Sequence, residues 1–358
     1  MTGVAIVGAG VISAAYLRNL CMFPELRVVA VDDLDTDLAA AVAADFGVPV
    51  SGGLPRVLAV PEVELVVNLT VPSAHAEVGL AVLRAGKHVY GEKPLALDVD
   101  QGEKLLAEAA GLGLRVGAAP DTFLGAGLQS AARALRSGLI GTPVAVSVAM
   151  QSMGPERWHP SPEYLYGPGG GPLFDLGPYY LTALVALLGP AVRVAGSTRI
   201  AHAWREIGSG PKAGQSFPVR VATHVHALID FASGANVSAT FSFDSPVDRR
   251  RIEITGTEGV LSLPDPNTYG GPLLIRAPHA ERWRELPVSG TTIGRGLGIL
   301  DLARSIRAGT PHRASGTLAL HVLEIMTAIT ASAEQGEFRR LRTTVSRPSP
   351  VTPHWPHA

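Results

Sequence analysis

The stretch GVAIVGAGVIS, residues 3–13, decides the fold. A short apolar run ends at Gly8, and Gly10 and Ser13 complete a G-x-G-x-x-S pattern between an expected strand and an expected helix. Glycines here allow a tight turn and a close approach of the backbone to a pyrophosphate, while the helix N-terminus offers N–H groups to the anion. The alternative is a glycine turn in a βαβ unit that binds nothing.

Two acids end the next expected strand, LRVVAVDD at residues 26–33. An acid at this position accepts hydrogen bonds from the adenosine ribose and repels a 2′-phosphate. No arginine stands beside Asp32 and Asp33, so the pattern favours NAD over NADP. We expect Asp33 to bind the ribose and Asp32 to be a solvated strand end.

The rest of the chain divides into two patterns. Apolar strands alternate with helices up to residue 120, which predicts a parallel sheet covered on both faces. Longer extended runs and turn residues follow, which are typical of an antiparallel or mixed sheet. The sequence therefore predicts an α/β protein with domains at 1–120 and 121–345 and an irregular, proline-rich tail at 346–358.

Composition narrows the class of protein. Lys and Arg number 30 and Asp and Glu 31, without a basic stripe, so nothing favours nucleic acid or an anionic membrane as a partner. The single cysteine, Cys21, fits a reducing compartment. The N-terminus lacks a basic leader region, and we find no apolar stretch of about 20 residues that would span a bilayer. These features predict a cytoplasmic location.

The most specific motif is KHVYGEKPLALD at residues 87–98, which places Lys93 between a glutamate and a proline after a strand. With VAIVGAG, NLTVPSAHAEVGLAVLRAG, GLIGTPVAV, GGGPLFDLGPYYLTAL and IEITGTEGVLSL, the chain resembles the Gfo/Idh/MocA family of oxidoreductases. The resemblance spans most of the chain. It implies a Rossmann domain, a second α/β domain with a large open, mostly antiparallel sheet, a nicotinamide cofactor and oxidation of a sugar or polyol hydroxyl.

The resemblance also implies positions for the cofactor. Pyrophosphate contacts are expected from Gly8, Gly10, Val11 and Ile12, ribose contacts from Asp33, further contacts from Asn68, Leu69, Thr70, Pro72 and His75, and contacts beside the nicotinamide ribose from Glu92 and Lys93. In this family Pro94 is expected to follow a cis peptide bond.

Three residues are candidates for catalysis. Lys93 supplies an ammonium that stabilises a developing alkoxide. Asp175 is expected to begin a helix, with Tyr179 four residues later on the same face. Many family members have histidine where Tyr179 stands, whereas glucose-fructose oxidoreductase and dihydrodiol dehydrogenase have tyrosine. The proton acceptor is therefore Tyr179 or Lys93, and the alternatives are an N-cap for Asp175 and a packing role for Tyr179, which fits Tyr180 better.

The substrate side is expected in the segment MGPERWHPSPEYLYGPGGGP, residues 153–172. Trp158, His159, Tyr164 and Tyr166 form either a lip that stacks on a sugar or a loop held together by aromatic packing. Asp121 follows the fifth strand and either faces the cofactor or substrate or is a helix cap. His224 and His226 are expected on opposite faces of a strand, and no spacing predicts a metal site.

These observations predict an NAD(P)-dependent dehydrogenase that moves a hydride between a CH–OH carbon and nicotinamide. By the same resemblance we expect a homodimer or homotetramer, through the open face of the second sheet. There are two alternatives. A redox-neutral glycosidase that retains NAD needs the same lysine and tyrosine. A non-catalytic NAD-binding sensor does not need them, and the presence of Lys93, Asp175 and Tyr179 argues against it.

Overall fold

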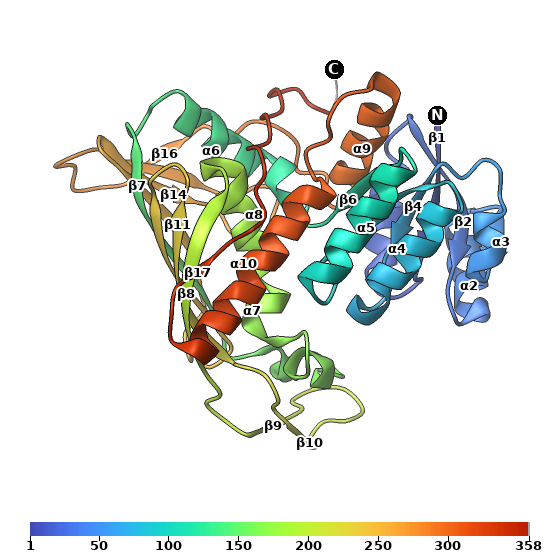
Figure 1. The fold of residues 1–358 in the computed structure, drawn as a ribbon, viewed down its shortest axis with the longest axis horizontal. Helices are drawn as coiled ribbons and strands as arrows, with labels where there is room; N and C mark the ends of the chain where they lie inside the picture. Colours follow the sequence, from blue (N-terminus) through green and yellow to red (C-terminus); the bar gives the residue numbers. More distant parts are fainter. Residues whose placement is uncertain (357–358) are drawn as a thin grey trace. The chain divides into compact units, whose positions relative to one another are not determined.

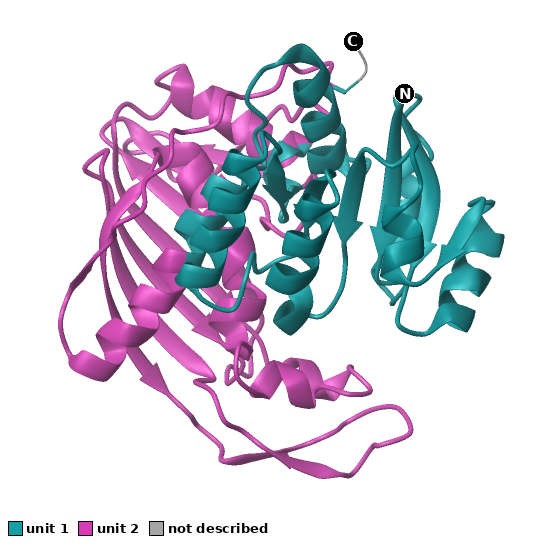
Figure 2. Ribbon diagram, turned by 45° about the vertical axis from the view of Figure 1, so that its right-hand side comes forward, with its two compact units in different colours: residues 1–125, 291–323, 356–358 teal, residues 126–290, 324–355 magenta. Residues whose placement is uncertain are grey.

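The computed structural model describes residues 1–356, which form two compact units. The first unit contains residues 1–125, 291–323 and Pro356, and the second contains residues 126–290 and 324–355 (Figure 2). The chain thus leaves the first unit twice and comes back to it each time, at residue 291 and at Pro356, and the sequence pattern does not reveal these returns.

The first unit contains one parallel sheet in the order β3-β2-β1-β4-β5-β6 (Figure 1). Its strands are β1 (Thr2–Val7), β2 (Leu26–Asp32), β3 (Val50–Gly52), β4 (Leu65–Asn68), β5 (His88–Gly91) and β6 (Val116–Ala118). Its helices are α1 (Ser13–Leu20), α2 (Thr36–Phe46), α3 (Leu54–Leu58), α4 (His75–Arg84), α5 (Val99–Gly111) and α9 (Leu297–Ala308). The predicted doubly wound Rossmann sheet is confirmed.

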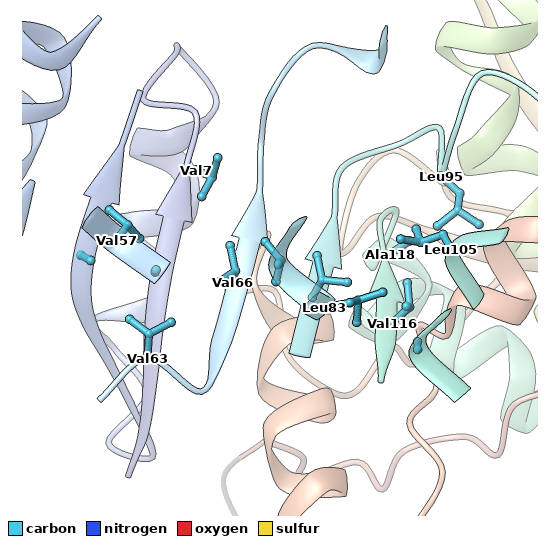
Figure 3. Close-up of a cluster of buried hydrophobic side chains, with 14 of the residues drawn as sticks. Val7, Val57, Val63, Val66, Leu83, Leu95, Leu105, Val116 and Ala118 are labelled. Atoms are coloured by element: carbon cyan, nitrogen blue, oxygen red, sulfur yellow. The ribbon is translucent and has the colours of Figure 1, made fainter. Parts of the chain in front are cut away.

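The core of this unit explains the apolar strands of the sequence. Val7, Val66 and Val116 come from three different strands, and Leu83 of α4 and Leu105 of α5 pack against the same cluster (Figure 3). Because helices cover the sheet, the strand side chains are buried, and β1 is buried at all six positions.

Local signals fix where the helices begin and end. The Asp35 carboxylate accepts hydrogen bonds of 3.1 Å from Asp37 N and Leu38 N and so caps α2. Gly47 ends this helix with φ of 66°, a left-handed conformation that favours glycine. The peptide bonds before Pro94 and Pro120 are cis, as expected for Pro94.

The second unit is built on a nine-stranded sheet in the order β16-β15-β14-β13-β7-β12-β11-β8-β17, in which only β7 and β12 pair in parallel. The strands are β7 (Pro143–Gln151), β8 (Ala191–Arg199), β11 (His224–Phe231), β12 (Asn236–Ser242), β13 (Arg249–Gly256), β14 (Gly259–Leu263), β15 (Leu273–Arg276), β16 (Arg284–Leu286) and β17 (Arg339–Arg340). A separate hairpin pairs β9 (Trp204–Glu206) with β10 (Ser216–Pro218). The predicted large, mostly antiparallel sheet is confirmed.

One face of this sheet is covered and the other is open. Helices α6 (Ala126–Arg136), α7 (Gly171–Asp175) and α8 (Gly177–Leu188) lie on the covered face (Figure 1). On β11 the buried side chains of Val225, Ala227 and Ile229 alternate with the more exposed His226 and Leu228. This alternation is what a strand with one solvated face requires.

One expectation about apolar stretches needs correction. Helix α10 (Gly316–Gln335) is long and apolar enough to cross a membrane by length and composition. However, 61% of its 18-residue apolar window is buried in the structure, which is the behaviour of a core helix. Its apolar composition therefore has an explanation in packing.

Candidate active site

The glycine turn after β1 has the geometry that the sequence predicts. Gly8 has φ of 98°, and a Cβ atom there would lie 2.7 Å from the carbonyl carbon and oxygen of Leu69. Gly10 is exposed, and a Cβ atom there would meet nothing within 4 Å. Gly8 is thus required by the close approach of the β4 loop, whereas Gly10 faces open space at the end of the sheet.

The N-terminus of α1 is suited to bind an anion. Ile12 occupies its N-cap without a side-chain hydrogen bond, and its first turn carries no acid. Ser13 is buried and its hydroxyl donates to Gly10 O at 2.7 Å, so it holds the turn against the helix. The free helix end carries partial positive charge, which favours a pyrophosphate.

The two aspartates after β2 have different environments. The Asp33 carboxylate accepts hydrogen bonds from Ala9 N at 2.7 Å and from Asp35 N at 2.9 Å, which holds it beside the glycine turn. Asp32 is only 5% exposed, so the expected solvated strand end is wrong. Burial, and secondly the charge of Asp33, raise the pKa of Asp32 to about 6.

A buried histidine joins the loops that follow β4 and β5. His75 is 3% exposed, and its Nδ1 lies 2.7 Å from Pro94 O while its Nε2 lies 3.0 Å from Thr70 O. Asn68, also buried, donates to His75 O at 3.0 Å and accepts from the Thr70 hydroxyl at 2.6 Å. We call Asn68, Thr70, His75 and Pro94 the loop clamp.

The loop clamp changes the interpretation of three predicted cofactor contacts. Asn68, Leu69 and His75 are buried. The hydrogen-bonding contacts of Asn68 and His75 hold the backbone of the loops that follow β4 and β5, at the carboxyl ends of the strands. Thr70 and Pro72 are partly exposed, so their side chains are the accessible ones in this loop. Direct contact of the buried three with NAD remains a prediction.

Both carboxylate oxygens of Glu92, which follows β5, accept hydrogen bonds. Its Oε1 accepts from the Tyr16 hydroxyl at 2.6 Å, and its Oε2 accepts from Lys93 N at 3.0 Å. Its own backbone N donates to Asn68 O at 2.8 Å. Tyr16 is fully buried on α1 and was not predicted, because its partner Glu92 lies 76 residues away in sequence.

Exposed apolar side chains gather at the carboxyl ends of the strands. Val11 and Leu34 are fully exposed and Val71 is 64% exposed, and they follow β1, β2 and β4 respectively. Adjacent strands end at the same edge, so these side chains offer apolar contacts to the rings of a dinucleotide. Leu34 and Val71 were not predicted from the sequence. The only sign of them there is that each is an apolar residue directly after Asp33 or Thr70.

Asp121 has a structural role in the first unit. It is 1% exposed, and its Oδ2 accepts hydrogen bonds of 2.9 Å from Gly296 N and Gly298 N at the start of α9. The structure therefore supports the alternative of a helix cap, although the capped helix is distant in sequence. A substrate contact for Asp121 remains a prediction.

The candidate residues of the second unit differ in detail from expectation. Asp175 ends α7 and does not begin a helix, because Leu176 is the N-cap of α8 and Pro178 lies in its first turn. The alternative of an N-cap for Asp175 is thereby wrong. Tyr179 is 6% exposed. Tyr180 packs edge-on against Phe241 with the ring centroids 5.9 Å apart, which confirms the packing role expected for Tyr180.

The aromatic segment combines both of the roles considered for it. Tyr166 is fully buried, and its ring packs against Phe217 and Phe243, so it is a packing residue. Its hydroxyl donates a hydrogen bond to the Glu156 carboxylate. In contrast, Trp158, His159 and Tyr164 form an edge-to-face series with ring centroids 5.5 and 5.6 Å apart. Trp158 is 69% and Tyr164 60% exposed, so these rings remain available to a ligand.

Comparisons with known proteins agree with this geometry. Residues 2–119 match the family model described as "Oxidoreductase family, NAD-binding Rossmann fold", and residues 128–262 match "GFO/IDH/MocA C-terminal domain". Together the two models cover well over half of the chain. The first unit is therefore an NAD-binding Rossmann domain.

Individual relatives are more distant. Trans-1,2-dihydrobenzene-1,2-diol dehydrogenase of Bos taurus is 26% identical over 77% of this chain and 78% of its own. D-glucoside 3-dehydrogenase of Escherichia coli K12 is 30% identical over 59% of this chain and 60% of its own. The structure of a levoglucosan dehydrogenase in complex with NADH and L-sorbose has a TM-score of 0.82 at 20% identity, covering 96% of this chain and 99% of its own, which shows a shared fold.

Replacing Asp32 with asparagine is expected to stabilise the cofactor-free protein at pH 8. The pKa of Asp32 is about 6 in the folded protein and about 4 when unfolded, so folding disfavours its charge and stability is lost as pH rises through about 6. The gain is on the order of 1 kcal/mol. Urea midpoints by circular dichroism should differ at pH 8 and converge near pH 4, and an equal difference at both values would contradict the assignment.

Replacing Tyr16 with phenylalanine is expected to lower turnover, because Glu92 loses one of the two donors that orient it. A hydrogen bond to a charged group contributes about 1.5–3 kcal/mol, so a roughly tenfold or greater loss of kcat is expected with NAD affinity little changed. Steady-state kinetics and a fluorescence titration with NADH measure the two quantities.

Tyr90 provides a matched control in the same unit. Its hydroxyl is buried and has no hydrogen-bond partner among the described residues. The Tyr90→Phe variant should keep the wild-type kcat, and equal losses in both variants would show that Tyr16 acts only through packing.

Proposed function

The chain belongs to the Gfo/Idh/MocA family of oxidoreductases, and on that premise we propose that it oxidises a hydroxyl-bearing carbon of a sugar, polyol or glycoside with NAD. NAD, when bound, supplies the carbon that accepts the hydride. The observation that carries the proposal is the loop clamp, because it fixes the Glu92–Lys93 segment at the edge that also holds the glycine turn and Asp33.

Lys93 is assigned the role of electrostatic catalyst. It is partly exposed, and its backbone N is held by Glu92 Oε2 at 3.0 Å. Oxidation of an alcohol leaves a developing alkoxide, which a nearby ammonium stabilises. The same charge lowers the pKa of a neighbouring proton acceptor.

Tyr179 is assigned the role of proton acceptor, with Lys93 as the alternative. A free tyrosine has a pKa of about 10, so work near neutral pH requires a neighbouring positive charge. Asp175 is assigned to orient the substrate or the base. These roles rest on the family resemblance and on the match of FDLGPYYLTAL to the family's pattern.

The substrate class follows from two lines of support. The names of the relatives describe dehydrogenases of a dihydrodiol and a D-glucoside. The exposed series Trp158, His159 and Tyr164 offers ring faces for the C–H side of a sugar and polar groups for its hydroxyls.

Assembly and location are part of the proposal. We assign a homodimer or homotetramer formed through the open face of the nine-stranded sheet. On that face Leu228 is 52% exposed among small side chains such as Ser147, Ala149 and Ser238. A cytoplasmic location is supported by the single cysteine, which is exposed.

Mixing the protein with NAD and a panel of sugars, inositols and glycosides is expected to raise absorbance at the NADH band for at least one compound. NADP should give a slower rise, since Asp33 stands where a 2′-phosphate would bind. The Lys93→Ala variant should lose roughly a hundredfold or more in rate, as for removal of one group that stabilises an oxyanion.

Each other outcome has a defined meaning. Consumption of a glycoside without net NADH would replace the dehydrogenase with the redox-neutral glycosidase. Binding of NAD without any turnover of a broad panel would favour the sensor. An unchanged rate in Lys93→Ala would remove Lys93 from the catalytic role.

Replacing Trp158 with alanine is expected to raise KM for the sugar while the Kd for NAD stays the same. Loss of one aromatic face corresponds to about 0.5–1.5 kcal/mol, or roughly two- to tenfold in KM. Trp283→Ala, which removes a ring that packs under Arg276, is the control. Equal KM values in Trp158→Ala and wild type would contradict a substrate role for this loop.

A further inference from the structure

Two clusters of polar side chains in the second unit have no part in the proposed function. One is the histidine pair of β11: His224 and His226 share the open face because they lie two residues apart on a strand, so the expectation of opposite faces is wrong. Their Nε2 atoms are 2.9 Å apart, so the rings satisfy each other by a hydrogen bond on the face assigned to assembly. The other cluster surrounds Arg205 of the hairpin β9–β10, and it adjoins the aromatic segment.

The hairpin β9–β10 packs against the aromatic segment, residues 153–172. Gly208 N donates to Glu156 O at 2.8 Å. A Cβ atom at Gly210 would lie 2.6 Å from Cβ of Pro160, so no side chain fits between the hairpin and the segment there. Glu156 and Pro160 flank the first of the exposed rings in the chain, so the hairpin sets the path of the backbone at that ring.

The guanidinium of Arg205 joins three parts of the chain. Its Nη1 donates to Met153 O at 3.3 Å and to the Glu156 carboxylate, both in the aromatic segment. Its Nη2 donates to Phe243 O at 3.2 Å and to the Asp244 carboxylate, directly after β12. The four hydrogens of the two Nη atoms thus have four acceptors, which connect the hairpin, the segment and the end of a sheet strand.

This cluster is buried and its charges are matched by hydrogen bonds. The side chains of Arg205, Glu156 and Asp244 are 8%, 9% and 10% exposed. The second oxygen of Glu156 accepts from the Tyr166 hydroxyl, and that of Asp244 accepts from the Thr223 hydroxyl at 2.6 Å. Buried charges require partners of this kind, so the cluster specifies one arrangement of the groups that it joins.

The arrangement requires arginine and not only a positive charge. A guanidinium is planar and donates in fixed directions from two separate Nη atoms, whereas a lysine ammonium has three donors on one nitrogen. The carbon between the Nη atoms also lies 5.3 Å from the ring centroid of Tyr166, where a flat cation stacks on the ring. A lysine at position 205 would keep the charge and lose the fork.

The exposed rings are connected to this cluster through the backbone. Trp158 N and His159 N donate to Pro155 O at 3.2 and 2.8 Å. Pro155 lies between the two residues of the segment that Arg205 holds. The rings themselves are exposed, so their directions depend on the backbone that carries them.

We propose that Arg205 is a positioning residue for the substrate: its fork holds the aromatic segment so that Trp158, His159 and Tyr164 meet the sugar, and it thereby sets KM. The inference rests on the proposed function of these rings. Arg205 does not touch the sugar, because its side chain is buried among protein groups.

The first test is the Arg205→Lys variant, which keeps a positive charge beside the two acids. For the panel sugar that yields most NADH, KM should rise roughly two- to tenfold, while kcat and the Kd for NADH stay the same, because the rings contribute to binding throughout the reaction. A KM equal to that of wild type overturns the proposal, and so does a loss confined to kcat or to NADH affinity.

Arg304→Lys is the matched control. Arg304 also joins a carboxylate, that of Glu25, to a backbone carbonyl, Pro356 O, but it does so in the first unit. Its KM should equal that of wild type. A rise in KM as large as that of Arg205→Lys would show that loss of any such fork has this effect, which overturns a specific role for Arg205.

A double variant tests whether Arg205 acts through the rings. If the fork serves to position Trp158, the KM of Arg205→Lys/Trp158→Ala should be lower than the product of the two single effects predicts. Single effects that multiply in full would show that Arg205 acts on KM by another route and overturn the proposal.

Hydrogen exchange followed by mass spectrometry tests the same link without sugar or NAD. Amides of residues 155–167 should exchange faster in Arg205→Lys than in wild type, whereas those of α8 should not change. The Tyr166→Phe variant removes one hydroxyl from the cluster and keeps the ring. It should shift KM and exchange in the same direction, and it decides the proposal if Arg205→Lys does not fold.

The two arms separate this inference from the function on which it rests. Exchange that is equal in the variants and wild type overturns the positioning role, whatever the protein catalyses. Faster exchange with an unchanged KM overturns the link to the substrate. A wild-type protein that turns over no sugar would overturn the proposed function and its KM, while the exchange result would still decide whether Arg205 holds the segment.

Discussion

The contact on which the site depends is that of the buried His75 ring with two backbone carbonyls: its Nδ1 lies 2.7 Å from Pro94 O and its Nε2 lies 3.0 Å from Thr70 O, and an N–H on either nitrogen donates to the carbonyl that it faces. One carbonyl belongs to the loop after β4 and the other to the loop after β5. A buried carbonyl without a partner costs about 1–3 kcal/mol, so a loop that left this arrangement would lose stability. The backbone of Leu69, next to Thr70, is also the surface that excludes a side chain at Gly8.

In the first unit, buried side chains hold the backbone in place, and different side chains are exposed to solvent. Asn68 and His75 are buried and hold backbone, and Glu92 holds the backbone N of Lys93 while Tyr16 holds Glu92. Other groups at the carboxyl ends of these strands, Lys93 among them, are partly exposed. Groups held in this way need little reorganisation during reaction, which is how an electrostatic catalyst gains its effect.

The sequence predicted what depends on neighbouring residues. The glycine turn and the alternation of strands and helices up to residue 120 depend on neighbouring residues, and the structure confirms both. Tyr16 was missed because its hydrogen bond spans 76 residues. Strand β3 and helix α3 were missed because three and five residues are too few to show a period. Asp175 was misplaced because α7 ends just where the pattern of α8 begins.

The most direct measurement of the central claim is the transfer of deuterium from substrate to cofactor in a single turnover. A sugar from the active panel, deuterated at the oxidised carbon, is mixed with NAD and excess protein, and the nicotinamide is examined by mass spectrometry. Our account predicts one deuterium at C4 of the reduced ring, with transfer slowed in Lys93→Ala. Oxidised sugar with no deuterium in the cofactor would contradict hydride transfer at this site.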